Sequence, residues 1–144
     1  MSQKGFSLVE MLLSIAIIGV IVAITMPVFG SFQVNDDMRT TTGIVVQSLR
    51  RAQILSQAVA GDSSWGVKVQ AGSVTIFKGN SYSGRDANFD EDFSIPSNIT
   101  LGATTEIIFT KFSGEPVAGG TIALTSVNNE TKNIVINSKG MVSY

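Results

Sequence analysis

The sequence predicts an α+β protein in which one long N-terminal helix packs on a small antiparallel β domain. Three observations carry this prediction. Residues 6–29 form an almost uninterrupted apolar run. Residues 31–60 then place mostly apolar side chains at spacings of three and four, which is typical of an amphipathic helix. After residue 61 the apolar period changes to two, and short alternating runs between turn residues predict β-strands.

The apolar run is long enough to span a membrane and holds a single ionisable residue. A helix over this run would be roughly 36 Å long, and a bilayer core needs about 30 Å. The one ionisable residue is Glu10. A carboxylate in an apolar segment is costly, so it indicates a functional position that needs a partner. Gly19 and Pro27 should permit a kink or local unwinding of this helix.

The flanks of the run predict its orientation. Lys4 precedes it, and Asp36 and Asp37 follow soon after it. The positive-inside tendency places the N-terminus in the cytoplasm and the β domain outside. An ordinary secretory signal peptide fits less well, because its apolar core is shorter, about 7–15 residues. A plain membrane anchor leaves Glu10 without a purpose.

The segment from Lys4 to Glu10, KGFSLVE, resembles the class III signal of type IV pilins and type II secretion pseudopilins. The resemblance implies that a prepilin peptidase cuts after Gly5 and that Phe6, the first mature residue, is N-methylated. Glu10 then stands at the fifth mature position. Gly19 and Pro27 fall where many relatives carry a helix-loosening glycine and proline.

The resemblance also implies the pilin fold, in which the helix drives filament assembly. Glu10 of one subunit would pair with the Phe6 amine of another and set the axial register. The implied partners are the peptidase, other pilin or pseudopilin subunits, an inner-membrane assembly platform and, before assembly, the lipid bilayer. The subunit would move from the inner membrane into a periplasmic or extracellular filament. The expected divisions are a leader over 1–5, a transmembrane and assembly helix over 6–30, an amphipathic helix over 31–60 and a β domain over 61–144.

The later segment of the β domain, from residue 107 to 142, is similar in its pattern of apolar positions and glycines to H-type pseudopilins and related minor pilins. Residues 50–54, RRAQI, partly match a stretch that such relatives carry late in the helix. This favours a minor subunit. A major pilin is the alternative, and the choice between a pilus, a secretion pseudopilus and DNA uptake stays open.

Residues 79–92 are expected to form a long polar loop. Asp86, Asn88, Asp90 and Asp92 alternate within it, like the first ligand positions of a calcium loop. Glu91 and Ser97 stand where such a loop needs glycine and glutamate. A solvated acidic loop is therefore favoured, with Ca²⁺ as the alternative; no other cofactor is expected.

Composition narrows the classes of function. The chain has 144 residues, no cysteine, no histidine and a formal net charge of −1. An enzyme is disfavoured, because the commonest general base and metal ligand is missing. DNA binding is disfavoured, because the basic residues lack a basic tail and interleaved aromatics; they are Arg39, Arg50, Arg51, Lys68 and Lys78. A membrane-tethered β module that binds DNA or a secreted substrate is the competing hypothesis.

Overall fold

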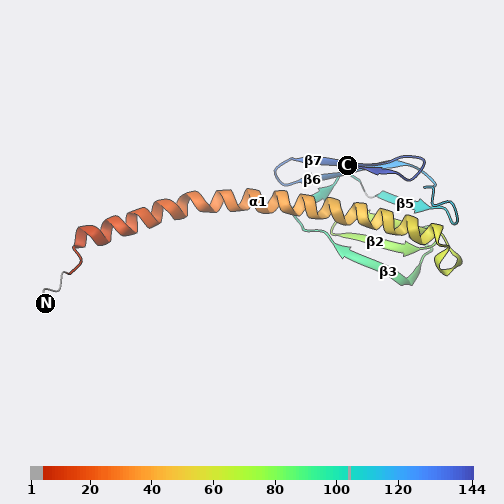
Figure 1. Cartoon of the computed structure of the whole chain (residues 1–144), viewed down its shortest axis with the longest axis horizontal. Coiled ribbons are helices and arrows are strands. Elements are labelled where there is room, and N and C mark those ends of the chain that lie inside the picture. The colour runs from red at the N-terminus through yellow and green to blue at the C-terminus, as the bar shows by residue number, and fades with distance from the viewer. Residues whose placement is uncertain (1–4, 104) are drawn as a thin grey trace. The chain divides into compact units, whose positions relative to one another are not determined.

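The computed structural model describes residues 5–103 and 105–144, with all side chains in these ranges except those of residues 25–29 and 31. One long helix, α1 (Leu8–Gln57), is followed by a short 3-10 helix, η1 (Ala60–Asp62), and then by β-strands (Figure 1). The chain divides into two compact units, Met1–Asn35 and Asp36–Tyr144. The α+β class and the long N-terminal helix are confirmed.

The first unit contains the apolar part of α1. Its side chains are exposed from residue 8 to residue 24, among them Leu8, Ile15 and Ile24, each with more than half of its surface accessible. Over the residues that the structure describes, no helix combines the length and apolarity that crossing a membrane requires. The membrane span over residues 6–30 stays a prediction. α1 continues through Gly19 and Pro27, and a kink at these residues stays a prediction.

The second unit holds two four-stranded sheets in which neighbouring strands are antiparallel, as the short links predict. Sheet A has the order β3-β2-β1-β5, and sheet B has the order β4-β6-β7-β8. The strands are β1 (Trp65–Gln70), β2 (Ser73–Lys78), β3 (Asp86–Ser94), β4 (Ile99–Leu101), β5 (Thr105–Phe109), β6 (Gly120–Ser126), β7 (Thr131–Ile136) and β8 (Val142–Ser143).

The hydrophobic core lies between the second half of α1 and both sheets. The helix contributes Val45, Leu49 and Ala52, which are fully buried. Alternate residues of the strands complete the same cluster, including Val67, Val69, Val74 and Ile76 from sheet A and Ile122, Leu124 and Ile134 from sheet B. The helical stripe and the period-two pattern in the sequence therefore both face one core.

Ser56 connects the end of α1 to sheet A through buried hydrogen bonds. Its hydroxyl accepts from the Trp65 backbone N–H at 2.9 Å and donates to the Phe109 carbonyl at 3.0 Å. The Ser56 carbonyl also accepts from the Phe112 N–H at 3.1 Å. The last turn of the helix is thereby fixed to β1 and to the chain around β5.

Two boundary predictions are wrong. Residues 79–92 are not all loop, because β3 begins at Asp86. This strand is exposed along most of its length, so it lacks the alternating apolar signal from which a strand is recognised. The helix ends at Gln57 rather than at residue 60. Val59 adopts a left-handed conformation with φ 54°, and the Trp65 indole N–H binds the Ala60 carbonyl at 2.8 Å, so the chain turns early toward β1.

Candidate functional site

The residues of the N-terminal motif lie at the start of α1. Gly5 and Phe6 precede the helix and are exposed. The Ser7 carbonyl accepts the backbone N–H groups of Glu10 and Met11 at 3.1 and 3.2 Å, which closes the first turn. Glu10 is in that turn, where a negative charge interacts favourably with the helix dipole. The motif thus ends in a carboxylate on a helix N-terminus.

The Glu10 carboxylate is exposed on the helix surface. Within the described part of the chain it forms no ion pair. Its neighbour on the next turn, Ser14, donates its hydroxyl to the Glu10 backbone carbonyl at 2.7 Å and leaves the carboxylate untouched. The carboxylate is therefore available to a cation from outside the subunit.

Apolar side chains surround the helix that follows. The exposed large hydrophobic residues between positions 8 and 24 are Leu8, Val9, Met11, Leu12, Leu13, Ile15, Ile17, Ile18, Val20, Ile21, Val22 and Ile24. Their spacing covers every side of the helix rather than one stripe. A helix that is apolar all round is buried in its working environment. This segment therefore needs lipid or other protein chains around it.

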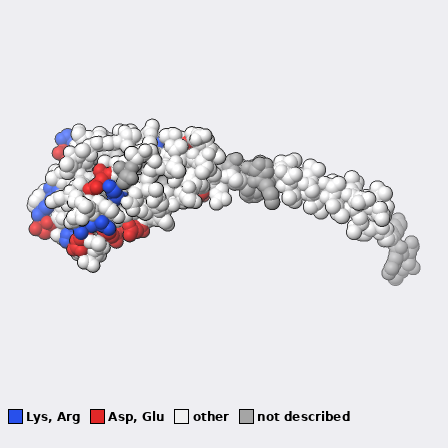
Figure 2. All heavy atoms as spheres, turned by 180° about the vertical axis from the view of Figure 1, so that it is seen from behind, with Lys and Arg blue, Asp and Glu red and all other residues white. Residues whose placement is uncertain are grey.

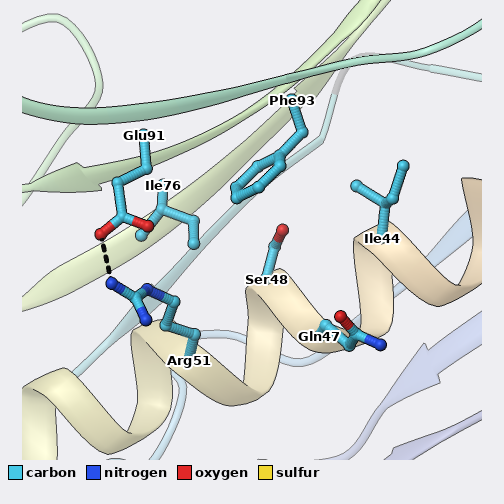
Figure 3. Close-up of a pocket in the computed structure, with 7 residues that line it drawn as sticks. All are labelled: Ile44, Gln47, Ser48, Arg51, Ile76, Glu91 and Phe93. Atoms are coloured by element: carbon cyan, nitrogen blue, oxygen red, sulfur yellow. Dashed lines mark hydrogen bonds and ion pairs between the residues drawn. The ribbon is translucent and has the colours of Figure 1, made fainter.

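A groove lies on the β domain, between α1 and the helix-facing side of sheet A. It has a volume of about 320 Å³ and is lined by Ile44, Gln47, Ser48, Arg51, Ile76, Glu91 and Phe93 (Figure 3). Arg51 Nη2 and Glu91 Oε1 form an ion pair of 2.6 Å across one end. The hydrogen bond that Arg51 donates to Glu91, aided by the attraction of the opposite charge, raises the pKa of Arg51 above its ordinary value. This groove was not predicted from the sequence, because Glu91 was expected to lie in a polar loop over residues 79–92, whereas it lies on β3.

The four residues for which calcium binding was the alternative interpretation lie on β3 and have protein partners. Asp90 accepts a hydrogen bond from Arg85 at 2.7 Å, and Asp92 accepts one from the Thr75 hydroxyl. Asn88 donates to Asp86 from its side-chain amide at 3.0 Å. Among the described residues, no three acidic side chains are grouped so that they could hold a metal ion. The structure therefore does not bring this predicted set together.

Three of the five basic residues considered for DNA binding have acidic or aromatic partners within the described structure. Arg51 pairs with Glu91, and Lys68 Nζ lies 3.4 Å from Glu106 Oε2. Lys78 Nζ stands 4.2 Å from the centre of the Phe89 ring. Figure 2 shows red atoms among the blue ones on the face of the domain that it draws. On this face charges of both signs are mixed, whereas a stripe of one sign is typical of nucleic-acid binding.

A second packed layer on the outer face of sheet A was not predicted. Phe77 is fully buried although it points away from the helix, because Tyr82 covers it with a ring-to-ring distance of 5.5 Å. The Arg85 guanidinium lies 3.8 Å from the Tyr82 ring centre, and the Tyr82 N–H binds Glu106 Oε1 at 2.8 Å. The signal was the adjacent pair Ile76-Phe77, which places apolar residues on both faces of the strand.

Comparisons with known proteins support the interpretation of the N-terminus. Residues 1–26 match the family described as prokaryotic N-terminal methylation motif, the signature of type IV pilins and pseudopilins. The predicted resemblance is confirmed over this segment. Comparisons with curated proteins and with solved structures gave no match.

Proposed function

We propose that the protein is a pilin-like filament subunit, made as a prepilin and assembled through α1. The observation that carries the proposal is the methylation motif over residues 1–26, continued by a helix that exposes apolar side chains on every side. The motif supports processing by a prepilin peptidase, with cleavage after Gly5 and N-methylation of Phe6. The all-round apolar surface supports burial of the helix against other subunits.

Two environments cover the apolar helix in this proposal. Before assembly the helix resides in the inner membrane, with the β domain on the outer side. After assembly the same side chains pack on the helices of neighbouring subunits. Transfer between the two costs little hydrophobic free energy, because each environment removes the side chains from water. The filament is a type IV pilus or a type II secretion pseudopilus, and the subunit is a minor one.

Glu10 gives the assembly its register. Cleavage after Gly5 creates an amine on Phe6, and a buried carboxylate is tolerated only when it is paired and hydrogen-bonded. Because Glu10 has no ion-pair partner among the described residues, the Phe6 amine of an adjacent subunit can take that place. The role is structural rather than catalytic, and the absence of cysteine and histidine from the sequence is in keeping with it.

The experiment compares Glu10→Gln with Glu91→Gln in the native host. The intact mass of the membrane-bound subunit should lack Met1 to Gly5 and gain one methyl group in both variants. Filaments should form with Glu91→Gln and be lost with Glu10→Gln, since only the second removes the charge that meets the Phe6 amine. Normal filaments from Glu10→Gln would refute the register role, and an uncut chain would refute the prepilin pathway.

A further inference from the structure

The edge of sheet A formed by β3 is open to a further strand. β3 is the first strand in the order of this sheet, and its residues 91–94 pair with residues 73–76 of β2 on one side. In the described part of the chain, no strand pairs with its other side. An unpaired strand edge presents backbone N–H and C=O groups that can bind another extended chain.

The groove lies where the side chains of such an added strand would point. Strand side chains alternate between the two faces of a sheet. On β3, Glu91 and Phe93 face the helix, and both line the groove together with Ile44 and Ser48 of α1 (Figure 3). A strand beside β3 would therefore direct every second side chain into this space. Its walls include the exposed edge of Phe93 and the side chain of Ile44, so apolar side chains fit there.

The charge of β3 selects among the chains that could bind. The strand carries four acidic residues. Arg51 pairs with Glu91 and Arg85 pairs with Asp90, whereas Asp86 and Asp92 form no ion pair within the described residues. A second copy of β3 would place like charges opposite one another, which is destabilising. A strand with basic side chains would meet opposite charges instead.

We propose that the free edge of β3 and the adjoining groove bind an extended peptide segment as an added β-strand. The segment carries apolar side chains at alternate positions, which enter the groove, and basic side chains between them, which face Asp92 and its neighbours. This surface belongs to the unit Asp36–Tyr144 and does not depend on the N-terminal motif. Its occupation would couple the subunit to a partner protein rather than to a second copy of the same chain.

The test uses the full chain in nanodiscs of zwitterionic lipid, with empty nanodiscs as the blank. The probe is the peptide acetyl-KVKIKVK-amide, and binding is followed by calorimetry. Two further peptides carry N-methyl groups on alternate backbone amides, one set on the lysines and one on the apolar residues. In a bound strand the backbone amides of alternate residues point to opposite sides, so only one of the two sets of methylated amides can point toward β3. We expect one methylated peptide to lose about tenfold or more in affinity and the other to bind nearly as well as the parent.

Protein variants locate the site. Gln47→Trp should fill the groove and lower the affinity about tenfold or more, whereas Arg50→Trp adds the same side chain one turn along, outside the groove, and should keep the affinity. Asp92→Asn should weaken peptide binding and reduce the salt dependence of that binding. This variant tests the site independently if Gln47→Trp fails to fold. Glu10→Gln should leave binding unchanged, which separates this proposal from the filament function.

Three results would overturn the inference. Equal binding of all three peptides would exclude strand addition. If a folded Gln47→Trp variant and the Asp92→Asn variant each bind the peptide with the affinity of the parent protein, the peptide binds elsewhere. A change of oligomeric state in Gln47→Trp, but not in Arg50→Trp, would show that the groove is instead an interface between copies.

Discussion

At the scale of single residues, two neighbouring threonines on α1 are buried with different consequences. The Thr42 hydroxyl donates to the Met38 carbonyl at 2.7 Å. Among the described residues, the Thr41 hydroxyl has no hydrogen-bond partner, although Thr41 is fully buried. A buried polar group without a partner costs about 1–3 kcal/mol of desolvation. Nothing in the sequence distinguishes the two positions, because the difference depends on which backbone and side-chain atoms lie nearby.

We predict that Thr41→Val raises the free energy of unfolding by about 1 kcal/mol, because the change removes the unpaired hydroxyl and keeps the side-chain shape. Thr42→Val is the matched control and should lower it by about 1 kcal/mol, since it loses a hydrogen bond. Urea unfolding of both variants, followed by circular dichroism, measures the two changes. If both lower stability equally, the Thr41 hydroxyl has a partner in solution.

Asp62 gives a prediction for pH dependence. The hydrogen bond from Lys111, aided by the attraction of its charge, lowers the pKa of Asp62 below its ordinary 3.8. Because the folded-state pKa is the lower one, the pair stabilises the fold fully above the unfolded value, and this contribution disappears as the pH falls through the folded value. The effect is small, since Asp62 is exposed.

Carboxyl chemical shifts in an NMR titration should show Asp62 titrating below pH 3.8. Lys111→Met should return its pKa toward the ordinary value and remove this part of the acid dependence of stability. An unchanged Asp62 titration in Lys111→Met would show that the pair does not persist in solution.

At the scale of elements, the outer layer of sheet A depends on a glycine in β1. A Cβ atom at Gly66 would overlap the Phe77 ring and lie 3.0 Å from the Ile107 carbonyl oxygen. The absence of a side chain at Gly66 therefore leaves the space beside β1 that the Phe77 ring occupies, where Tyr82 covers it. This layer orders the segment between β2 and β3, and so it holds the strand whose edge we propose as a binding surface.

We predict that Gly66→Ala lowers the free energy of unfolding by about 1–3 kcal/mol, because the added methyl group displaces a fully buried ring. Gly43→Ala is the control: apart from its chain neighbours and the nearby backbone of α1 itself, no described atom lies within 4 Å of the added Cβ, and the change should raise helix stability by about 1 kcal/mol. Thermal unfolding compares the two. A Gly66→Ala variant as stable as the parent would mean that Phe77 can move without cost.

Elements were predictable where one side of them faces the core. The stripe on α1 and the alternation in β1 and β2 identified these elements, because burial of one face selects apolar residues at the matching period. β3 and the burial of Phe77 were not predicted, for the opposite reason. β3 buries few side chains, and Phe77 is covered by a loop, whose sequence has no periodic apolar pattern. The groove was not predicted either, because β3 forms one of its walls. Gly5, Phe6 and Glu10 were identified by a motif, which fixes their positions in the chain but not their partners.

At the scale of the whole molecule, burial is distributed unequally between the two units. Every residue of the hydrophobic core cluster lies between Met38 and Ile136, within the unit Asp36–Tyr144. The exposed apolar residues of positions 8–24 lie in the other unit. The fold of the unit Asp36–Tyr144 therefore rests on its own side chains, whereas the described side chains of the N-terminal unit contribute none to this core. The exposed apolar side chains of positions 8–24 can be buried only by their surroundings.

We predict that a fragment of residues 36–144 folds cooperatively and stays monomeric in water, because it retains the whole core and lacks the apolar helix surface. Circular dichroism, urea unfolding and sedimentation velocity measure this. The full chain should associate when detergent is removed, and Leu12→Lys with Ile15→Lys should reduce that association without changing the unfolding of the domain. An unfolded fragment would show that residues before Asp36 contribute to the core. If the fragment associates as strongly as the full chain, the self-association arises from the surface of residues 36–144 rather than from the apolar helix. The edge of β3 would then be the first surface to test for that contact.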